Sequence, residues 1–70
     1  MDILTFIKEK GVTEAERLAD ASGTKLVYLK QIGTGFRRPS GQLALRIEQE
    51  SGSLITRGEL RPDLYPDNLS

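Results

Sequence analysis

Glycine residues divide this sequence into short segments, and this division constrains the fold more than any other feature. Within the segments, apolar residues recur at three- and four-residue spacing, which is the period of an amphipathic helix. No alternation of apolar and polar residues is long enough to suggest a strand. Gly33-Thr34-Gly35 and the Arg38-Pro39 step both disfavour the continuation of a helix. The sequence therefore predicts an all-α fold, a small bundle of four to five short helices.

Residues that can cap a helix N-terminus stand before the apolar segments. They are Asp2, Thr13, Thr24, Ser40 and Thr56. Two of them also have the form of a capping box, in which a glutamate follows three residues later: Thr13 with Glu16, and Thr56 with Glu59. The expected helix ends are Gly11, Gly23 and Gly52.

The 70-residue chain has no cysteine and no histidine, which are the usual donors for disulfides, zinc sites and imidazole acid–base chemistry. We therefore expect no enzyme activity, no metal, no cofactor and no small-molecule ligand. No apolar run approaches the ~20 residues that span a membrane, and no signal-peptide pattern is present, which predicts a cytoplasmic protein without a membrane partner. The length predicts one domain over residues 1–65, with a flexible tail over residues 66–70.

The stretch from Ala15 to Ile32 has the spacing of a helix-turn-helix. Such a motif needs a small residue where its two helices cross, a glycine in the turn and apolar residues on the buried side of the second helix. Ala19 and Gly23 meet the first two needs. The apolar positions are Leu18, Leu29 and Ile32. An ordinary αα-hairpin can have the same spacing, so the motif alone leaves a plain helical hairpin open.

If Leu29 and Ile32 face the core, the other side of the segment 25–32 faces solvent. The candidates there for DNA contact are Lys25, Leu26, Val27, Tyr28, Lys30 and Gln31. Lysine donates to guanine and glutamine pairs with adenine, so the expected base readers are Lys25, Lys30 and Gln31. Leu26 and Val27 are candidates for contact with a thymine methyl. Tyr28 is a candidate for a phosphate contact, with a half-buried place in the core as the alternative.

The following loop, residues 33–40, is rich in groups that suit a phosphate. Its glycines allow close approach, Arg37 and Arg38 supply charge, and the helix amides capped by Ser40 point at an anion. Thr34 is expected to join the two arginines in fixing the register on the DNA backbone. Phe36 is expected to fold back on the core and anchor the loop. A flexible surface loop is the alternative.

The net charge is zero, but the charges are unevenly distributed. Between Thr24 and Arg46 there are five cations and no carboxylate, and all ten acids lie outside this window. The cations are Lys25, Lys30, Arg37, Arg38 and Arg46. Such a chain can turn a basic face toward DNA and keep an acidic back. A solvated charged surface is the alternative reading.

The run 23–32, the loop sequence Gly35-Phe36-Arg37-Arg38-Pro39-Ser40 and the segment 43–48 together resemble the Cro/C1-type helix-turn-helix family. Within it, the chain is most similar to small phage and prophage Cro and YdaS-type regulators. Their short C-terminal signature is similar to the segment from Thr56 to Tyr65, which contains residues 59–64. The resemblance implies a lambda-repressor-like fold and operator binding, usually as a two-fold dimer, with base contacts from the recognition helix.

Together these features predict a sequence-specific transcriptional regulator, a Cro-like repressor of phage or prophage origin, that binds double-stranded DNA. A possible homodimer would use apolar C-terminal residues, which could equally fold over the chain's own core. They are Leu54, Ile55, Leu64, Tyr65 and Leu69. The alternative function is a protein-interaction module, such as an antitoxin-like partner, with the same helix-turn-helix fold.

Overall fold

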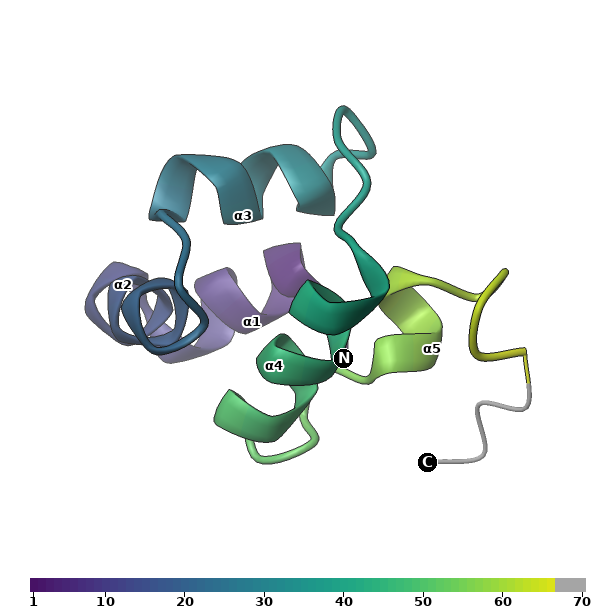
Figure 1. The fold of residues 1–70 in the computed structure, drawn as a ribbon. Helices are drawn as coiled ribbons and strands as arrows, with labels where there is room; N and C mark the ends of the chain where they lie inside the picture. Colours follow the sequence, from purple (N-terminus) through teal and green to yellow (C-terminus); the bar gives the residue numbers. More distant parts are fainter. Residues whose placement is uncertain (67–70) are drawn as a thin grey trace.

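The computed structural model describes residues 1–66, and within them it has five helices and no strand. In chain order these are α1 (Ile3–Lys10), α2 (Val12–Ala21), α3 (Leu26–Gly33), α4 (Gly41–Glu50) and α5 (Arg57–Leu60). Figure 1 shows α3 at the top of the bundle and the end of α4 at the bottom. The predicted all-α bundle of four to five helices is confirmed. The dimer candidate Leu69 and, apart from Pro66, the predicted tail lie outside the described residues.

The first two helices are separated by a single residue, Gly11. Its amide donates to the Ile7 carbonyl at 2.9 Å, which closes α1 at the predicted position. The same glycine, at φ +92°, is also the N-terminal cap residue of α2, so that helix begins at Val12. Thr13 consequently lies inside the first turn. The predicted capping box of Thr13 and Glu16 is wrong, because the direct joint at Gly11 leaves no place for a separate cap.

A tight turn joins α2 to α3. Gly23, at φ +80°, donates its amide to the Asp20 carbonyl at 3.0 Å, and the next amide, of Thr24, donates to the Ala19 carbonyl at 2.8 Å. These two bonds form a Schellman motif, which requires a left-handed residue directly after the helix. Thr24 is thereby used in closing α2, and Lys25 takes the N-cap position of α3 with no side-chain cap. The prediction that Thr24 caps this helix is wrong.

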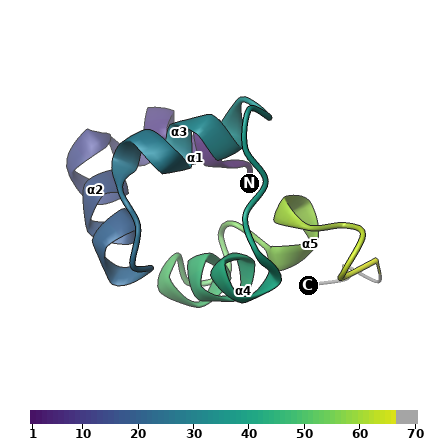
Figure 2. The same cartoon turned by 45° about the horizontal axis from the view of Figure 1, so that its top comes forward.

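The residues of the predicted motif occupy the positions that a helix-turn-helix requires. Leu18, Ala19 and Leu29 are fully buried or nearly so, and Ile32 is buried beside them. The remaining buried members of this core are Ile3, Phe6, Ile47 and Ile55. α2 contacts both α3 and α4, an arrangement that Figure 2 shows. The small side chain of Ala19 lets the helices approach closely. The α2–turn–α3 unit is therefore compatible with a helix-turn-helix.

The other three predicted N-caps are confirmed. The Asp2 carboxylate accepts the third amide of α1 at 2.7 Å, and the Ser40 hydroxyl accepts the third amide of α4 at 3.1 Å. Thr56 and Glu59 form the predicted capping box: each side chain accepts the backbone amide of the other residue. These caps satisfy amides that would otherwise lack partners at the helix starts.

The apolar C-terminal residues pack largely on their own chain. Ile55 is fully buried, so its inclusion in the predicted dimer surface is wrong. The Tyr65 hydroxyl donates to the Gly41 carbonyl at 3.3 Å. Leu64 lies against the same glycine, where an added Cβ would come within 2.8 Å of its Cδ1. Leu64 nevertheless stays half-exposed, as does Leu54.

Candidate nucleic-acid interface

The surface of α3 that faces away from the core carries exposed cations. Leu29 and Ile32 face inward, whereas Lys25 and Lys30 are exposed, as is Val27 at 61%. Within residues 1–66 neither lysine takes part in an ion pair. Both ammonium groups are therefore available as hydrogen-bond donors on the outer side of the helix.

Tyr28 lies partly in the core and partly on this outer surface. It is half-buried and packs against the core cluster. The guanidinium carbon of Arg37 stands 5.7 Å from the centre of its ring, within the range of a cation–π interaction. The ring thus connects the core to the loop that follows α3. Tyr28 therefore has the half-buried place in the core that was the alternative to a phosphate contact.

Gln31 anchors that loop to the last turn of α3. Its backbone carbonyl accepts the amides of Phe36 at 2.9 Å and Arg37 at 3.2 Å, and also the Thr34 hydroxyl at 3.1 Å. Its side-chain Oε1 accepts a further bond from the Nε of Arg37 at 2.9 Å. The loop is consequently tied to the helix at several points, so it is not a loose surface connection.

Phe36 does not fold back on the core. Its side chain is 74% exposed, and the buried apolar residue of this loop is Pro39 instead. The expectation failed because Gly35, at φ +83°, and the amide of Phe36 close α3 in a second Schellman motif. That turn holds the backbone of Phe36 away from the core.

Arg38 has a different environment from Arg37. Its Nη1 lies 3.6 Å from a carboxylate oxygen of Asp63, which in turn accepts two hydrogen bonds from Arg61, at 2.8 and 3.0 Å. Arg61 also donates to the Pro39 carbonyl at 2.8 Å and so ties this group to the loop. The Arg61 hydrogen bonds lower the pKa of Asp63 to about 2, with a smaller contribution from the charge of Arg38. Asp63 was not among the predicted site residues, because nothing in its spacing indicates that it reaches Arg38.

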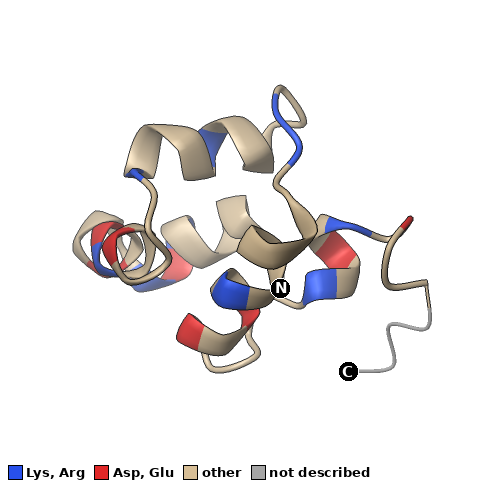
Figure 3. Ribbon diagram, viewed as in Figure 1, with Lys and Arg blue, Asp and Glu red and all other residues tan. Residues whose placement is uncertain are grey.

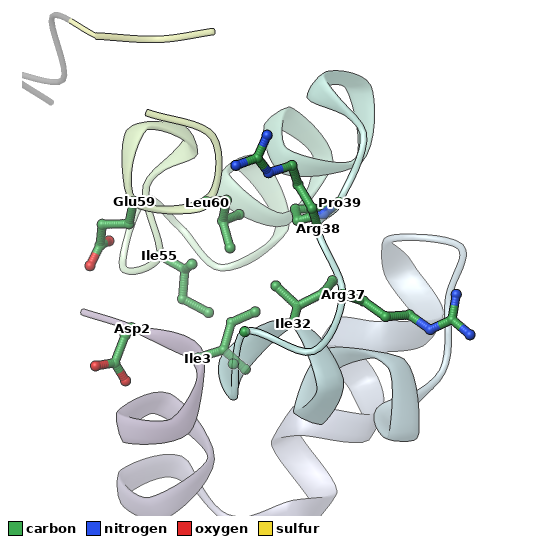
Figure 4. Close-up of a pocket in the computed structure, with 11 residues that line it drawn as sticks. Asp2, Ile3, Ile32, Arg37, Arg38, Pro39, Ile55, Glu59 and Leu60 are labelled. Carbon is green, nitrogen blue, oxygen red and sulfur yellow. The ribbon is translucent and has the colours of Figure 1, made fainter. Parts of the chain in front are cut away.

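A cleft of about 300 Å³ lies behind the loop, between the start of α1, the end of α3 and α5. Its apolar lining consists of Ile3, Ile32, Pro39, Ile55 and Leu60. In the close-up of Figure 4, Asp2 and Glu59 stand at one edge, while the side chains of Arg37 and Arg38 point away from each other. The cleft therefore separates the basic loop from acidic groups on the other edge.

The five cations between Thr24 and Arg46 do not all lie on one basic surface of the folded chain. In Figure 3 the charged residues on α3 and the loop after it are all Lys or Arg, whereas acids stand on the other helices. Arg46, however, donates to the Ala21 carbonyl at 2.8 Å and so stabilises the C-terminal end of α2. At the start of α3, Glu16 and Asp20 line a groove together with Lys25. The surface without nearby acids is thus smaller than the five cations suggested.

Two further predicted site residues have local roles. Leu26 is partly buried and lines the same groove as Lys25 and Asp20. The hydroxyl of Ser40 is exposed but serves as acceptor in capping α4. The structure therefore groups Tyr28, Gln31, Thr34 and Arg37 by contact, and leaves the remaining candidates separate around them.

Residues 1–66 contain no group of three acidic side chains that could hold a metal ion. In the same part of the chain, no helix has both the length and the apolar character needed to cross a membrane.

The chain is similar in sequence to a prophage protein. The prophage transcriptional regulatory protein of Escherichia coli (strain K12) is 39% identical to it over 49 residues, which cover 70% of this chain and 74% of the relative. No family model matches the chain, and no solved structure matches it.

Proposed function

Since this chain belongs to the family of prophage transcriptional regulatory proteins, we propose that it is a sequence-specific regulator that binds double-stranded DNA with α3 in the major groove. The observation that carries the proposal is the outer surface of α3. It presents two lysines that take part in no ion pair within residues 1–66. It is continuous with the following loop, whose Arg37 is hydrogen-bonded to Gln31 of α3. The proposed role is that of a regulator rather than an enzyme, acting in the cytoplasm.

The dimensions of α3 suit this docking. An α-helix with its side chains is about 10–12 Å across, similar to the width of the major groove, and the eight residues of α3 give about two turns to lie in it. Lys25 and Lys30 would donate to base edges. Exposed Val27 would touch a thymine methyl, with partly buried Leu26 at the margin of that contact. In this arrangement the amides at the start of α3, which have no side-chain cap, are suited to a phosphate oxygen.

The residues around the helix would fix its position on the DNA backbone. Thr34 and Arg38 stand on the loop, Ser40 caps the start of α4, and half-buried Tyr28 lies on α3. Contacts of this kind set register and orientation and carry no sequence information directly. Their electrostatic part makes the affinity depend on salt.

A single copy with so few contacts would bind weakly, so the proposal includes two copies on a palindromic operator. Their recognition helices would lie about 34 Å apart, one turn of B-DNA. Among the described C-terminal residues, Leu54 and Leu64 remain exposed and are the candidates for contact between the copies. Binding at a promoter would then repress transcription by occupying it.

The test is selection of binding sites from random duplexes, followed by fluorescence anisotropy with the selected duplex and a scrambled one. The proposal predicts a palindromic site and at least about 10³-fold tighter binding to it than to the scrambled duplex. Equal affinity for both duplexes would contradict sequence-specific binding. Enrichment of no duplex at all would favour the protein-interaction module instead. Sedimentation of the complex would count the copies on one duplex.

A further inference from the structure

Arg37 is held against the outer surface of α3 at three points. Its amide donates to the Gln31 carbonyl at 3.2 Å, and its Nε donates to Gln31 Oε1 at 2.9 Å. Its guanidinium carbon lies 5.7 Å from the centre of the Tyr28 ring. The guanidinium is therefore oriented over two residues of α3 in the free protein, which lowers the entropy cost of using it in a defined contact.

The neighbouring arginine lacks this arrangement. Arg38 is largely exposed and its partner Asp63 about half-exposed, their contact is 3.6 Å long, and α3 takes no part in it. The two guanidinium groups also point away from each other, as Figure 4 shows. Of the two arginines, only Arg37 shares a surface with the residues of α3 that would face the bases.

The hydrogen bonds that hold Arg37 also decide what it can recognise. An arginine has five N–H donors, and the Nε–H is used on Gln31, which leaves the four on Nη1 and Nη2. Gln31 Oε1 uses one of its two lone pairs on this bond, and Nε2 keeps both of its N–H donors. Together the two side chains offer mainly donors, six N–H groups against one remaining lone pair on Gln31 Oε1.

This donor pattern selects among the bases. Bidentate pairing of glutamine with adenine needs the amide oxygen to face the N6 amino group, and the bond from Arg37 turns that oxygen toward Nε instead. Guanine presents two acceptors in the major groove, O6 and N7, which match the two terminal nitrogens of an arginine. The arrangement therefore favours guanine over the adenine expected from Gln31 alone.

We propose that Arg37 is a specificity-determining residue that reads a guanine in the major groove, and that Gln31 positions it. Arg37 donates from Nη1 and Nη2 to O6 and N7, and Gln31 Nε2 donates to an acceptor on the adjacent base. Tyr28 supports the guanidinium from the side of the helix. This inference rests on the proposed DNA-binding function and assigns Arg37 to a base, whereas the sequence pattern assigned it to a phosphate.

The test compares sites selected from random duplexes by the parent protein, Arg37→Ala and Arg38→Ala. Arg38→Ala is the matched control, because it removes the same side chain from the adjacent position. We expect the parent and Arg38→Ala to select the same guanine in each half-site, and Arg37→Ala to accept any base there. Arg38→Ala should weaken binding to all duplexes alike. Thermal melts of each protein establish that it is folded.

A second measurement uses the parent protein, so it does not depend on the folding of a variant. Replacing the selected guanine by 7-deazaguanine removes the N7 acceptor and should weaken parental binding, roughly fivefold or more. The same replacement should leave the affinity of Arg37→Ala unchanged. Gln31→Met, which keeps length and removes the acceptor for Nε, should reduce the guanine preference in the parent but have no effect on it in the Arg37→Ala background.

The outcomes separate this inference from the function it builds on. If Arg37→Ala keeps the parental guanine preference and binds all duplexes more weakly, as Arg38→Ala does, then Arg37 is a phosphate contact and the proposal is wrong. The proposal is also wrong if 7-deazaguanine weakens binding of the parent protein at no position of its selected site. If the parent selects no sequence, the DNA-binding function itself fails.

Discussion

Nη1 of Arg38 lies 3.6 Å from the carboxylate of Asp63, so an acid from a distant part of the chain stands beside a cation of the loop after α3. In the sequence, the window from Thr24 to Arg46 has no carboxylate. In the folded chain, the segment after α5 returns to this loop and is fastened there by the bond from Arg61 to the Pro39 carbonyl. In the proposed DNA complex, Asp63 would therefore compete with a phosphate for Arg38.

Replacing this acid should strengthen DNA binding. We expect Asp63→Asn to bind a duplex more tightly, by about fivefold at most, because an exposed ion pair is weak. The dependence of log affinity on log salt should steepen by up to about 0.9, the value for one additional phosphate contact. Fluorescence anisotropy across a salt series measures both quantities.

The control for Asp63→Asn is Glu50→Gln, which removes one negative charge from the last residue of α4. That end of the helix lies on the opposite side of the bundle from α3 (Figure 1). Glu50→Gln should change the salt slope little. In an Arg38→Ala background, Asp63→Asn should no longer raise affinity. Equal gains from both acid replacements would mean that net charge, and not the Arg38 contact, sets the effect.

The carboxyl group of Asp63 should titrate unusually low. Its pKa is lowered from 3.8 to about 2, chiefly by the hydrogen bonds from Arg61. Because the pKa is lower in the folded state, the stabilisation is present above pH 3.8 and is lost as the pH falls toward 2. Carbon-detected NMR of the side-chain carboxyl measures this. Arg61→Ala should return the midpoint toward 3.8, and Arg38→Ala should move it much less; an unchanged midpoint in Arg61→Ala would refute the assignment.

The turn between α2 and α3 should depend on the left-handed backbone at Gly23. An alanine there would meet no atom within 4 Å, so its cost comes from the backbone conformation alone. Gly23→Ala should lower the free energy of unfolding by about 1–2 kcal/mol. Urea denaturation followed by circular dichroism gives the value. A change within error would show that this turn adopts another conformation.

Replacing Ser22 should stabilise the fold, whereas replacing Gly23 should destabilise it. The buried hydroxyl of Ser22 has no hydrogen-bond partner within residues 1–66. Burying an unsatisfied polar atom costs free energy, so Ser22→Ala should raise the free energy of unfolding, by up to about 1 kcal/mol. The same denaturation experiment applies. Clear destabilisation by this substitution would indicate that the hydroxyl has a partner in solution.

The helix ends were the most predictable part of the fold. Gly23 and Gly35 end their helices in Schellman motifs, because a glycine after an apolar segment supplies the left-handed residue locally. The helix starts were less predictable. The strongest sequence pattern, Thr13 with Glu16, was wrong, while the weaker pattern of Thr56 and Glu59 was right. The position of an N-cap depends on where the preceding helix ends. A four-residue pattern does not contain that information.

The candidate site was predictable in composition but not in its contacts. The positions of Lys25 and Lys30 on the outside of α3 follow from helical periodicity once Leu29 and Ile32 face inward. The bond between Arg37 and Gln31 depends on how the chain turns after α3, which no residue pattern sets by itself. For the same reason the exposure of Phe36 was missed.

Chemical-shift mapping tests the central claim, that α3 and its loop form the DNA-binding surface, most directly. In this measurement, ¹⁵N-labelled protein is titrated with the selected duplex, and the amide shifts are followed residue by residue. We expect the largest changes over residues 25–40 and small changes at the end of α4 and in α5. Large changes confined to α4 and α5, with α3 unaffected, would contradict it.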